Sequence, residues 1–477
     1  MLPLWEGWDE YAHFAGIQHW TDHGTLPHTT DRISREIDES MRLAPLPWEL
    51  GWIGPPYVTH AAWWALPAAE REDRTRRLAA LSPGLAHQPA TEINGRPFVF
   101  YEAQQPPVFY WIASAVMRPA SDWPLGERVR LIRLLSVFLA SFAIPFTFLA
   151  GRSVTAFATY GAALLAVAPG FAIDSAHVAN DGLAIGIAAL FLWLMTREKT
   201  SWFAAGLVLG AAILVKASLL VLAPILIVLW IRRPKPLGLA LALGLAIGGW
   251  WYVRNLLIGV PLTGWQESVP IDRVAVAAVA LFRNGGWVNE AYTIAKSFTW
   301  FGAWSFITLR TWMYLILEIC AIGGMLAGVA NKKASVRVPL VFTICFAIAI
   351  TGGAAAYYAV HAVAGIPGWY LWPAGGAMAI LIVAGLGRFS IAFAGMLALT
   401  DLFGAAARMM PYYAGLAARN HGSVTQFPLA LARLHVPVWL AIAWAAATIA
   451  IPALMLQARA RGHRLVRRGN RDRQEDC

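Results

Sequence analysis

The sequence predicts an all-α polytopic membrane protein: a bundle of about 11 transmembrane helices with two long extracytoplasmic loops. First, 58% of the 477 residues are hydrophobic, only 14% are charged, and mean hydropathy is +0.54, whereas a soluble domain carries about 25% charged residues. Second, the apolar residues fall into blocks of roughly 15–22, the length of a helix that crosses a bilayer. Third, the chain has 23 tryptophans, and indole rings favour the membrane–water boundary.

Polarity divides the chain into five parts. Residues 1–129 form a polar first loop with short interfacial helices, and residues 257–310 form a second polar loop. Residues 130–256 and 311–458 carry the transmembrane helices, and residues 459–477 form a basic tail. The roughly eleven expected spans are 131–150, 156–173, 180–196, 202–215, 217–231, 237–256, 311–330, 337–358, 370–387, 389–406 and 436–457. The spans on either side of Lys216 are short, so a single bent hairpin is an alternative there.

The lysines and arginines of the short loops predict the orientation. Taken in order, they fall on one side of the bundle, and positive charge in short loops marks the cytoplasmic side. These residues are Arg152, Arg197, Lys199, Arg232, Arg233, Lys235, Lys332, Lys333 and Arg388, together with the tail. Both long loops are therefore expected on the extracytoplasmic side, where the chemistry is expected as well.

The start of the chain conflicts with this topology. A translocated region of about 129 residues normally follows a signal peptide or a transmembrane helix, and this sequence shows neither before the first loop. We therefore expect an upstream helix that this sequence omits. Translocation driven by the first span alone is the alternative.

Two classes of site are not expected. Cys320, Cys345 and Cys477 give neither a disulfide framework nor a metal-binding spacing. The net charge of +11 lies largely in short loops and the tail, with no basic patch interleaved with aromatic residues. Nucleic acid is therefore not an expected partner.

The N-terminal stretch "WDEYAHF" holds the first candidate site. A carboxylate at a membrane surface can take a proton from a hydroxyl, or can hold a divalent cation together with its neighbour. Asp9 and Glu10 are the candidates for these roles, and on a helix His13 would share a face with them. A solvated acidic N-terminus is the plain alternative.

Two further polar stretches lie in outward connections. In "YEAQQPPVFYW" the two prolines start a short helix, and Tyr101, Glu102 and Gln104 are candidates to line a site beside the acidic pair. An interfacial helix with no site is the alternative. In "DSAHVANDG", Asn180 and Asp181 are candidates to contact the substrate. Capping the start of a helix explains the presence of these two residues about equally well.

Cationic residues at membrane depth or at the outer boundary form the third candidate group. An ionisable side chain within a bilayer is costly and marks a function by default, which applies to Lys216 in "ILVKASLL". Lys216 and Arg254 together are candidates to bind a phosphate, with Arg310 as a weaker addition. Snorkelling to lipid headgroups is the alternative for Arg254.

A tryptophan-rich run follows in the second loop. "FTWFGAWSFITLRTW" contains Trp300, Trp304 and Trp312. A belt at the membrane interface is the favoured interpretation, and stacking on a sugar is the alternative.

The order of these motifs resembles a known family. "WDEYAHF", "QQPPVFYW", "HVANDGLAI", "LVKAS" and "WWYVRNLLIGVPL" follow one another as in the bacterial GT-C integral-membrane glycosyltransferases, which use polyprenyl-phosphate sugars. The resemblance implies a multi-pass protein of the bacterial inner membrane with its active site on the extracytoplasmic side. Family members place a transmembrane helix directly before the acidic pair, and this sequence departs from that pattern.

The resemblance also implies a reaction. Asp9 would deprotonate the acceptor hydroxyl in a single inverting displacement, Glu10 would orient the acceptor or help to hold a metal, and His13 would position Asp9. Lys216 and Arg254 would stabilise the departing phosphate, and the two long loops would cover an acceptor that is a glycan, a lipid or a protein. The transferred sugar is a hexose or a pentose.

Two other functional classes remain open at this point. A lipid or polysaccharide flippase would place acids in the middle of the membrane or show repeated halves, but Glu318 is the only acid well inside an expected span. A non-catalytic partner in envelope assembly would retain the fold and lose the acids. The retained Asp9 and Glu10 argue against the second class.

Overall fold

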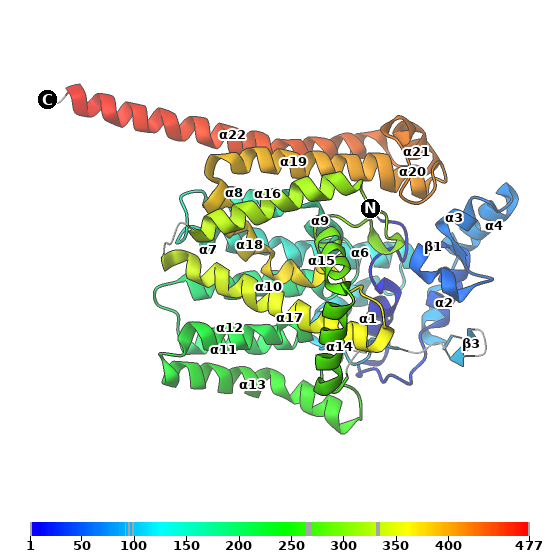
Figure 1. Ribbon diagram of the computed structural model, residues 1–477. Helices are drawn as coiled ribbons and strands as arrows, with labels where there is room; N and C mark the ends of the chain where they lie inside the picture. The colour runs from blue at the N-terminus through cyan, green and yellow to red at the C-terminus, as the bar shows by residue number, and fades with distance from the viewer. Residues whose placement is uncertain are drawn as a thin grey trace.

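The computed structural model describes residues 2–90, 92–93, 96–97, 100–263, 269–330 and 334–475, without the side chains of 92–93, 96–97, 334 and 458–475. The protein is an all-α polytopic membrane protein, as predicted. Long helices run side by side along one direction, and an assembly built from the N-terminal residues covers one end of the bundle (Figure 1). The C-terminal helix extends beyond the other end.

The assembly at the end of the bundle is made of short elements. Its helices are α1 (Glu10–His23), α2 (Arg35–Leu43), α3 (His60–Trp63), α4 (Ala68–Ala79) and α5 (Val108–Met117), with 3₁₀ turns at Trp48–Ile53, Pro83–His87 and Arg118–Ala120. Its strands are β1 (Pro45–Leu46), parallel to β2 (Val58–Thr59), and β3 (Glu92–Ile93), antiparallel to β4 (Arg96–Pro97). Helix α5 follows the two prolines, as predicted.

The bundle holds most of the remaining helices. They are α6 (Leu125–Ser141), α7 (Ala143–Gly151), α8 (Ala158–Val167), α9 (Pro169–Ser175), α10 (Asp181–Thr196), α11 (Trp202–Ile213), η4 (Ala217–Val221), α12 (Leu222–Trp230), α13 (Pro234–Leu257), α16 (Thr311–Ala330), α17 (Arg337–His361), α18 (Gly375–Leu386), α19 (Ser390–Phe403) and α22 (Val438–Glu475). Further 3₁₀ turns lie at Ala303–Ser305, Ala334–Val336, Gly368–Ala374, Gly387–Phe389 and Val424–Gln426. A π-helical turn, Gly404–Met409, joins α19 to α20 (Met410–Tyr413), which α21 (Phe427–Arg433) follows.

The eleven expected spans all fall on apolar helices of the bundle. Within the described residues, six helical segments are long and apolar enough to cross a membrane, and the one over Gly368–Tyr413 combines two expected spans. Four expected spans correspond to shorter apolar helices: Ala158–Val167, Asp181–Thr196, Trp202–Ile213 and Ala217–Trp230. The multi-pass architecture is therefore confirmed, and the number of crossings stays a prediction.

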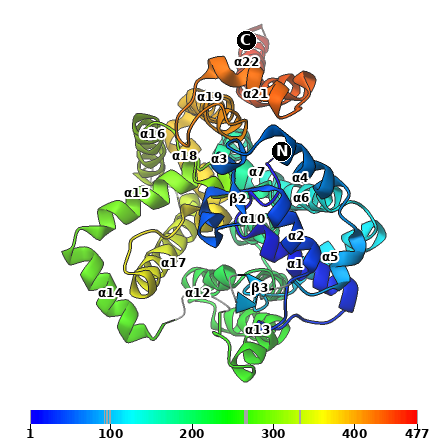
Figure 2. The same cartoon turned by 90° about the vertical axis from the view of Figure 1, so that its right-hand side faces the viewer.

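The second long loop contains two helices that the sequence interpretation did not specify. These are α14 (Ile271–Arg283) and α15 (Gly286–Thr299). Both stand crosswise to the long helices of the bundle (Figure 1) and lie at its periphery when the bundle is viewed along its axis (Figure 2). The described part of the segment from 257 to 310 thus contains two helices, and its assignment as a loop outside the membrane stays a prediction.

The described residues form two main hydrophobic cores. One joins α10, α11, α12, α13 and α17 within the bundle, and the other joins α1, α5 and the first half of α6. The outer faces of the long helices remain apolar and exposed, as at Leu245 of α13 and Ile319 of α16. An apolar outer surface is what lipid requires, because lipid tails cannot hydrogen-bond to polar groups.

Glu6 connects the start of the chain to segments that follow much later in the sequence. Its side chain is fully buried and accepts hydrogen bonds from the Ser305 amide and the Tyr413 hydroxyl, both at 2.8 Å. The His60 Nε2 atom lies 3.3 Å from its other oxygen. A buried carboxylate is tolerated only when such partners replace water, so these contacts fix the N-terminal segment against the segments around Ser305 and Tyr413.

Candidate functional site

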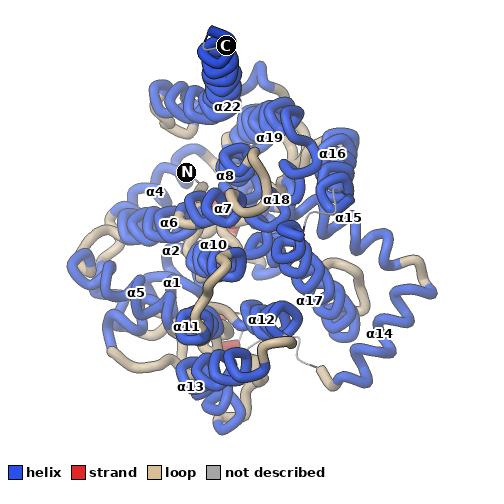
Figure 3. Tube along the Cα trace, turned by 90° about the vertical axis from the view of Figure 1, so that its left-hand side faces the viewer, coloured by secondary structure: helices blue, strands red, loops and turns tan. Residues whose placement is uncertain are grey.

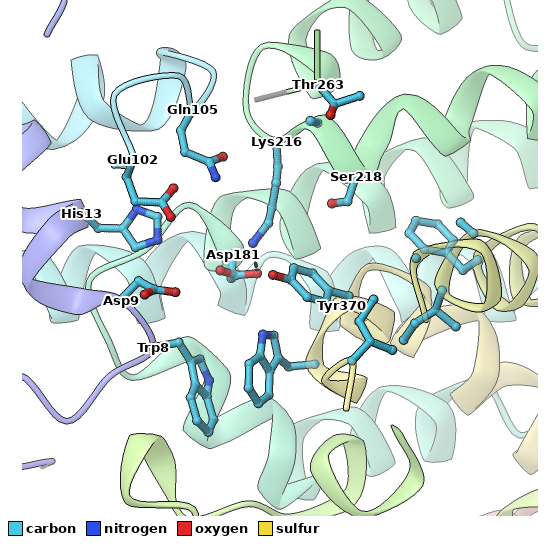
Figure 4. A pocket seen from close by; sticks show the side chains of 17 residues that line it. Trp8, Asp9, His13, Glu102, Gln105, Asp181, Lys216, Ser218, Thr263 and Tyr370 are labelled. Atoms are coloured by element: carbon cyan, nitrogen blue, oxygen red, sulfur yellow. Dashed lines mark hydrogen bonds and ion pairs between the residues drawn. The ribbon is translucent and has the colours of Figure 1, made fainter. Parts of the chain in front are cut away.

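A cavity of about 240 Å³ lies where the N-terminal assembly meets the bundle (Figure 4). One side is polar and the other side, formed by α17 and the segment that follows it, is apolar. The polar side chains are Asp9, His13, Glu102, Gln105, Asp181, Lys216, Ser218, Thr263 and Tyr370, and the apolar or aromatic residues are Trp8, Ala217, Phe346, Ala349, Ile350, Gly353, Ile366 and Trp369. Five residues predicted from the sequence therefore meet in one cavity: Asp9, His13, Glu102, Asp181 and Lys216.

The backbone before α1 turns the Asp9 side chain into this cavity. Asp9 adopts a left-handed conformation, with φ 48° and ψ 23°, which aspartate tolerates better than most residues. Its carbonyl accepts hydrogen bonds from the amides of Ala12 and His13, while its carboxylate makes no capping bond to the helix. The carboxylate instead accepts a hydrogen bond from Tyr101.

Tyr101 is fixed as a donor to this carboxylate. Burial raises the pKa of its phenol well above the ordinary value, and the neighbouring charge of Asp9 adds to the shift. The phenol therefore stays protonated at physiological pH. The sequence prediction that Tyr101 lies beside Asp9 is confirmed, although Tyr101 supports the carboxylate rather than lining the cavity.

His13 lies one helical turn after Asp9 and faces the same cavity. Its Nδ1 atom is 2.7 Å from the Tyr110 hydroxyl of α5. Burial, with the charge of Lys216 as a further cause, lowers the pKa of His13 to about 3. The imidazole is therefore neutral at physiological pH and can orient a polar ligand without adding charge.

Lys216 and Asp181 form a buried ion pair at the centre of the cavity (Figure 4). Their side chains are 11% and 10% exposed. The Lys216 ammonium also lies 5.4 Å from the centroid of the Tyr370 ring, within the range of a cation–π contact. Asp181 is the first residue of α10, so its carboxylate gains further stability from the helix N-terminus.

A break between α11 and η4 places Lys216 there. Lys216 itself is extended, with φ −154° and ψ 136°. The carbonyl groups of Ile213, Leu214 and Val215 would lack partners at such a break, but each receives a donor from another element. The Tyr252 hydroxyl, the Val108 amide and the Asn180 side chain supply these hydrogen bonds at 2.7, 3.1 and 3.1 Å.

Asn180 thus supports the break rather than capping its own helix. It occupies the N-cap position of α10, as predicted, but its side chain makes no capping hydrogen bond. Its amide nitrogen bonds to Val215 and lies 3.3 Å from Gln105 Oε1. The capping interpretation of the Asn180 side chain is therefore wrong, and the residue holds the cavity wall without lining it.

Glu10 points away from Asp9, because consecutive residues at the start of a helix face different directions. Its carboxylate is fully buried and binds the Arg133 guanidinium of α6 at 2.6 and 2.7 Å. The Val178 amide donates to it as well, at 3.0 Å. Burial alone would raise the pKa of Glu10, but Arg133 and Val178 outweigh burial and lower it below the ordinary value.

Arg133 also holds the segment that precedes Asp9. It donates hydrogen bonds to the carbonyls of Leu2 and Pro3 at 2.5 and 2.6 Å. Gly7 allows this segment to approach the bundle, because a Cβ atom at that position would lie 2.2 Å from the Cβ of His177. The N-terminal segment is therefore clamped on both sides of the turn that presents Asp9.

Replacement of Arg133 by methionine is expected to destabilise the protein by about 3–5 kcal/mol, because it leaves Glu10 buried without its countercharge. The additional change Glu10→Gln should recover part of this loss. Because the folded-state pKa of Glu10 is lowered, its contribution to stability is present above its ordinary pKa and is lost as pH falls through the lowered value. Thermal unfolding of the purified protein across acidic pH measures both effects.

Arg130→Met is the matched control. Arg130 lies on the same helix, and its ion pair with Glu127 is 54% and 51% exposed. Such surface pairs contribute about 0–1 kcal/mol. Equal shifts of the unfolding temperature in Arg133→Met and Arg130→Met would contradict the clamp.

Besides Glu10, Tyr101 and Asn180, three further predicted site residues lie outside the cavity. The Gln104 side chain is buried, its backbone carbonyl accepts a hydrogen bond from the Trp251 indole, and the neighbouring Gln105 lines the cavity instead. Arg254 stacks on Trp251, 4.5 Å from the ring centroid, and reaches the Pro27 carbonyl. Arg310 is exposed. The geometry does not support the predicted pairing of Arg254 with Lys216 at one phosphate.

The tryptophans of the second loop also differ from the sequence interpretation. Trp300 is fully buried, Trp304 is 8% exposed and packs on Tyr11, and only Trp312 is widely exposed. Neither an interfacial belt nor a sugar-stacking surface describes Trp300 and Trp304, because both belong to the protein interior. The aromatic wall of the cavity is instead Trp8 stacked on Trp369, with ring centroids 3.9 Å apart.

The predicted cation site at the acidic pair does not fit the structure. Glu10 binds Arg133 with both oxygens and faces away from Asp9. Within the described residues, no group of three histidine, cysteine or acidic side chains has a geometry that could hold a metal ion. Glu10 is therefore not available as a metal ligand beside Asp9.

Comparison with known proteins bears on this arrangement. Residues 104–252 match the family model of the dolichyl-phosphate-mannose-protein mannosyltransferases. The match contains Gln105, Asp181 and Lys216 and confirms the resemblance to the GT-C membrane glycosyltransferases over this segment. A search of the curated proteins finds no match.

Two solved structures resemble the chain. ArnT from Cupriavidus metallidurans bound to undecaprenyl phosphate shares 19% sequence identity at a TM-score of 0.42, over 75% of this chain and 62% of that one. The apo state of the same protein shares 17% identity at a TM-score of 0.42, over 76% of this chain and 64% of that one. This chain thus spans less than two thirds of the length of ArnT.

Proposed function

We propose that this chain is a membrane glycosyltransferase that moves a sugar from a polyprenyl-phosphate donor to an acceptor hydroxyl. One observation carries the proposal: an acid from the N-terminal assembly, a lysine at a helix break and an apolar wall of α17 line the same cavity. These three elements suit an acceptor, a phosphate and a lipid chain respectively. The family match over residues 104–252 supports a polyprenyl-type donor.

The donor phosphate is assigned to Lys216. Its ammonium stabilises the negative charge that grows on the phosphate oxygen as the bond to the sugar breaks. Asp181 holds Lys216 in place and shares its charge before the donor binds. The first isoprene units lie along Phe346, Ile350 and Gly353, whose surfaces require no hydrogen-bonding partner.

Asp9 acts as the general base. Its carboxylate accepts the proton of the acceptor hydroxyl while that oxygen forms a bond to the anomeric carbon of the sugar. The bond from this carbon to the phosphate oxygen breaks, and the lipid phosphate leaves with the electron pair. A single displacement of this kind inverts the anomeric configuration. Tyr101 restrains the carboxylate, and the neutral His13 positions the reacting groups.

The reaction takes place on the extracytoplasmic side of a bacterial inner membrane. This orientation follows from the lysines and arginines of the short loops. The acceptor, whether glycan, lipid or protein, approaches from the side of the N-terminal assembly. The transferred sugar is a hexose or a pentose.

Proteoliposomes that contain the purified chain and a radiolabelled polyprenyl-phosphate sugar test the proposal. Extracts of envelope glycans and lipids supply the acceptor. We expect label to move from the lipid phosphate to an acceptor and polyprenyl phosphate to accumulate. Movement of intact labelled lipid between the leaflets without cleavage would instead indicate a flippase and would refute the proposal.

A further inference from the structure

Helix α14 carries an apolar surface that the protein leaves uncovered. It packs on α17 and α15, and only Ala277 and Leu281 are buried among its residues. Ile271 is 83% exposed, Phe282 is 78% exposed and Val279 is 50% exposed. At 3.6 residues per turn these three side chains fall within roughly a quarter of the helix circumference. They form a continuous apolar strip next to the buried face.

The remaining arc of α14 carries its three charged residues. Asp272 and Arg283 lie opposite the buried face near the two ends of the helix, Arg273 lies closer to the buried Ala277, and all three are exposed. Val276, which is 71% exposed, lies in the same arc. A helix of this kind is amphipathic, with an apolar side wider than its protein contact requires. A polar side with arginines and an apolar side with a phenylalanine are typical of helices that lie in a membrane interface.

The position of α14 identifies what covers the strip. The helix stands crosswise to the spanning helices at the end of the bundle that carries the N-terminal assembly (Figure 1), and it lies at the rim of the bundle in the axial view (Figure 3). Nearby, the last residues of α13 and the following turn also expose apolar side chains, namely Leu256, Leu257, Ile258 and Leu262. The strip therefore continues the apolar surface of a transmembrane helix at the level where that helix ends.

We infer that α14 lies in the outer leaflet of the membrane that the bundle spans. Ile271, Val279 and Phe282 lie among the lipid chains, and Arg273 and Arg283 lie at the level of the lipid phosphates. Burial of the strip in lipid is favourable because it removes apolar surface from water. Because α14 packs on α17, whose residues line the cavity, the membrane surface is held beside the cavity. The inference does not depend on the proposed function.

Site-directed fluorescence tests this placement in the full-length protein. Cys320, Cys345 and Cys477 are first replaced by serine, and Phe282→Cys is labelled with an environment-sensitive dye. The protein is reconstituted in vesicles of phosphatidylethanolamine and phosphatidylglycerol, with or without lipids spin-labelled on the acyl chain near the headgroup. We expect blue-shifted emission, strong quenching by the spin-labelled lipid and several-fold weaker quenching by aqueous iodide than at the control position.

Asp272→Cys is the control, because it lies on the same helix in the polar arc. Its dye should be quenched by iodide and little affected by the spin-labelled lipid. Ile271→Cys repeats the test on the strip if Phe282→Cys does not fold. Equal iodide quenching at 282 and 272 would overturn the inference. Protection at 282 from both quenchers would overturn it as well, since it would show that another protein surface covers the strip.

Discussion

Asp9→Asn is expected to reduce the kcat of sugar transfer by about 10²–10⁴-fold, the range that general bases contribute. Asparagine has the shape of aspartate and can still accept the hydrogen bond that Tyr101 donates to Asp9. It cannot take a proton from the acceptor hydroxyl. The KM for the lipid donor should change little, because the donor phosphate is assigned to Lys216. Steady-state transfer in proteoliposomes measures both constants.

Glu72→Gln is the matched control for this change. Glu72 lies on α4 of the same N-terminal assembly, is exposed and does not line the cavity. Its substitution should leave both constants unchanged. If Asp9→Asn transfers sugar at the wild-type rate, Asp9 is not the base. A fall in kcat that is accompanied by an equal fall in folded protein would likewise not support that role.

The second large effect is expected at Lys216. Lys216→Met should reduce kcat by about 10²–10³-fold, the loss seen when one group that stabilises a developing oxyanion is removed. It should also destabilise the protein, because Asp181 would remain buried without its countercharge, at a cost of about 3–5 kcal/mol. Transfer kinetics and thermal unfolding together measure the two effects.

A double variant separates these two effects. Lys216→Met combined with Asp181→Asn removes both charges, so much of the lost stability should return. Transfer should stay low, because no cation then faces the phosphate. Lys199→Met, in an exposed connection away from the cavity, serves as the control. Recovery of transfer in the double variant would show that Lys216 matters only for folding.

Much of the fold could be predicted from the sequence, because a lipid environment restricts the backbone to a few structures. Blocks of apolar residues must form helices in lipid, where no water satisfies the backbone, and each expected span falls on an apolar helix. The break at Lys216 was also foreseeable, since a lysine between two short apolar runs marks a point where the helix stops. The helices α14 and α15 were missed because their amphipathic pattern lies within a segment classified by its polarity.

The candidate site was less predictable, because it depends on contacts between distant segments. Asp9 and Glu10 are adjacent and chemically alike, yet Tyr101 engages one and Arg133 binds the other. Nothing in the local sequence tells which of the two acids faces the cavity. Arg133 lies 123 residues after Glu10, near the polar start of a transmembrane helix, where an arginine more often contacts water or headgroups.

Gln105 and Trp369 line the cavity, and the local sequence did not predict either of them for the same reason. Gln105 follows Gln104 directly, and the choice between them depends on how α5 meets α11 and α13. Trp369 lies in "HAVAGIPGW", which connects two expected spans, and its stacking partner Trp8 is far away in sequence. The only signal in the sequence was the position of this tryptophan in a connection between two expected spans. That signal does not single out Trp369, because the chain has 23 tryptophans.

Photochemical labelling of the cavity tests the central claim most directly. The probe is a polyprenyl-phosphate sugar with a photoreactive group on the isoprene unit next to the phosphate, added to full-length Asp9→Asn protein in proteoliposomes. We predict that sequencing will locate the cross-links at Lys216 to Ser218 and at Ile350 to Gly353, and that unlabelled donor will compete them away. Cross-links confined to the lipid-facing surfaces of α13 and α22, unaffected by competing donor, would contradict the assignment of this cavity to the donor.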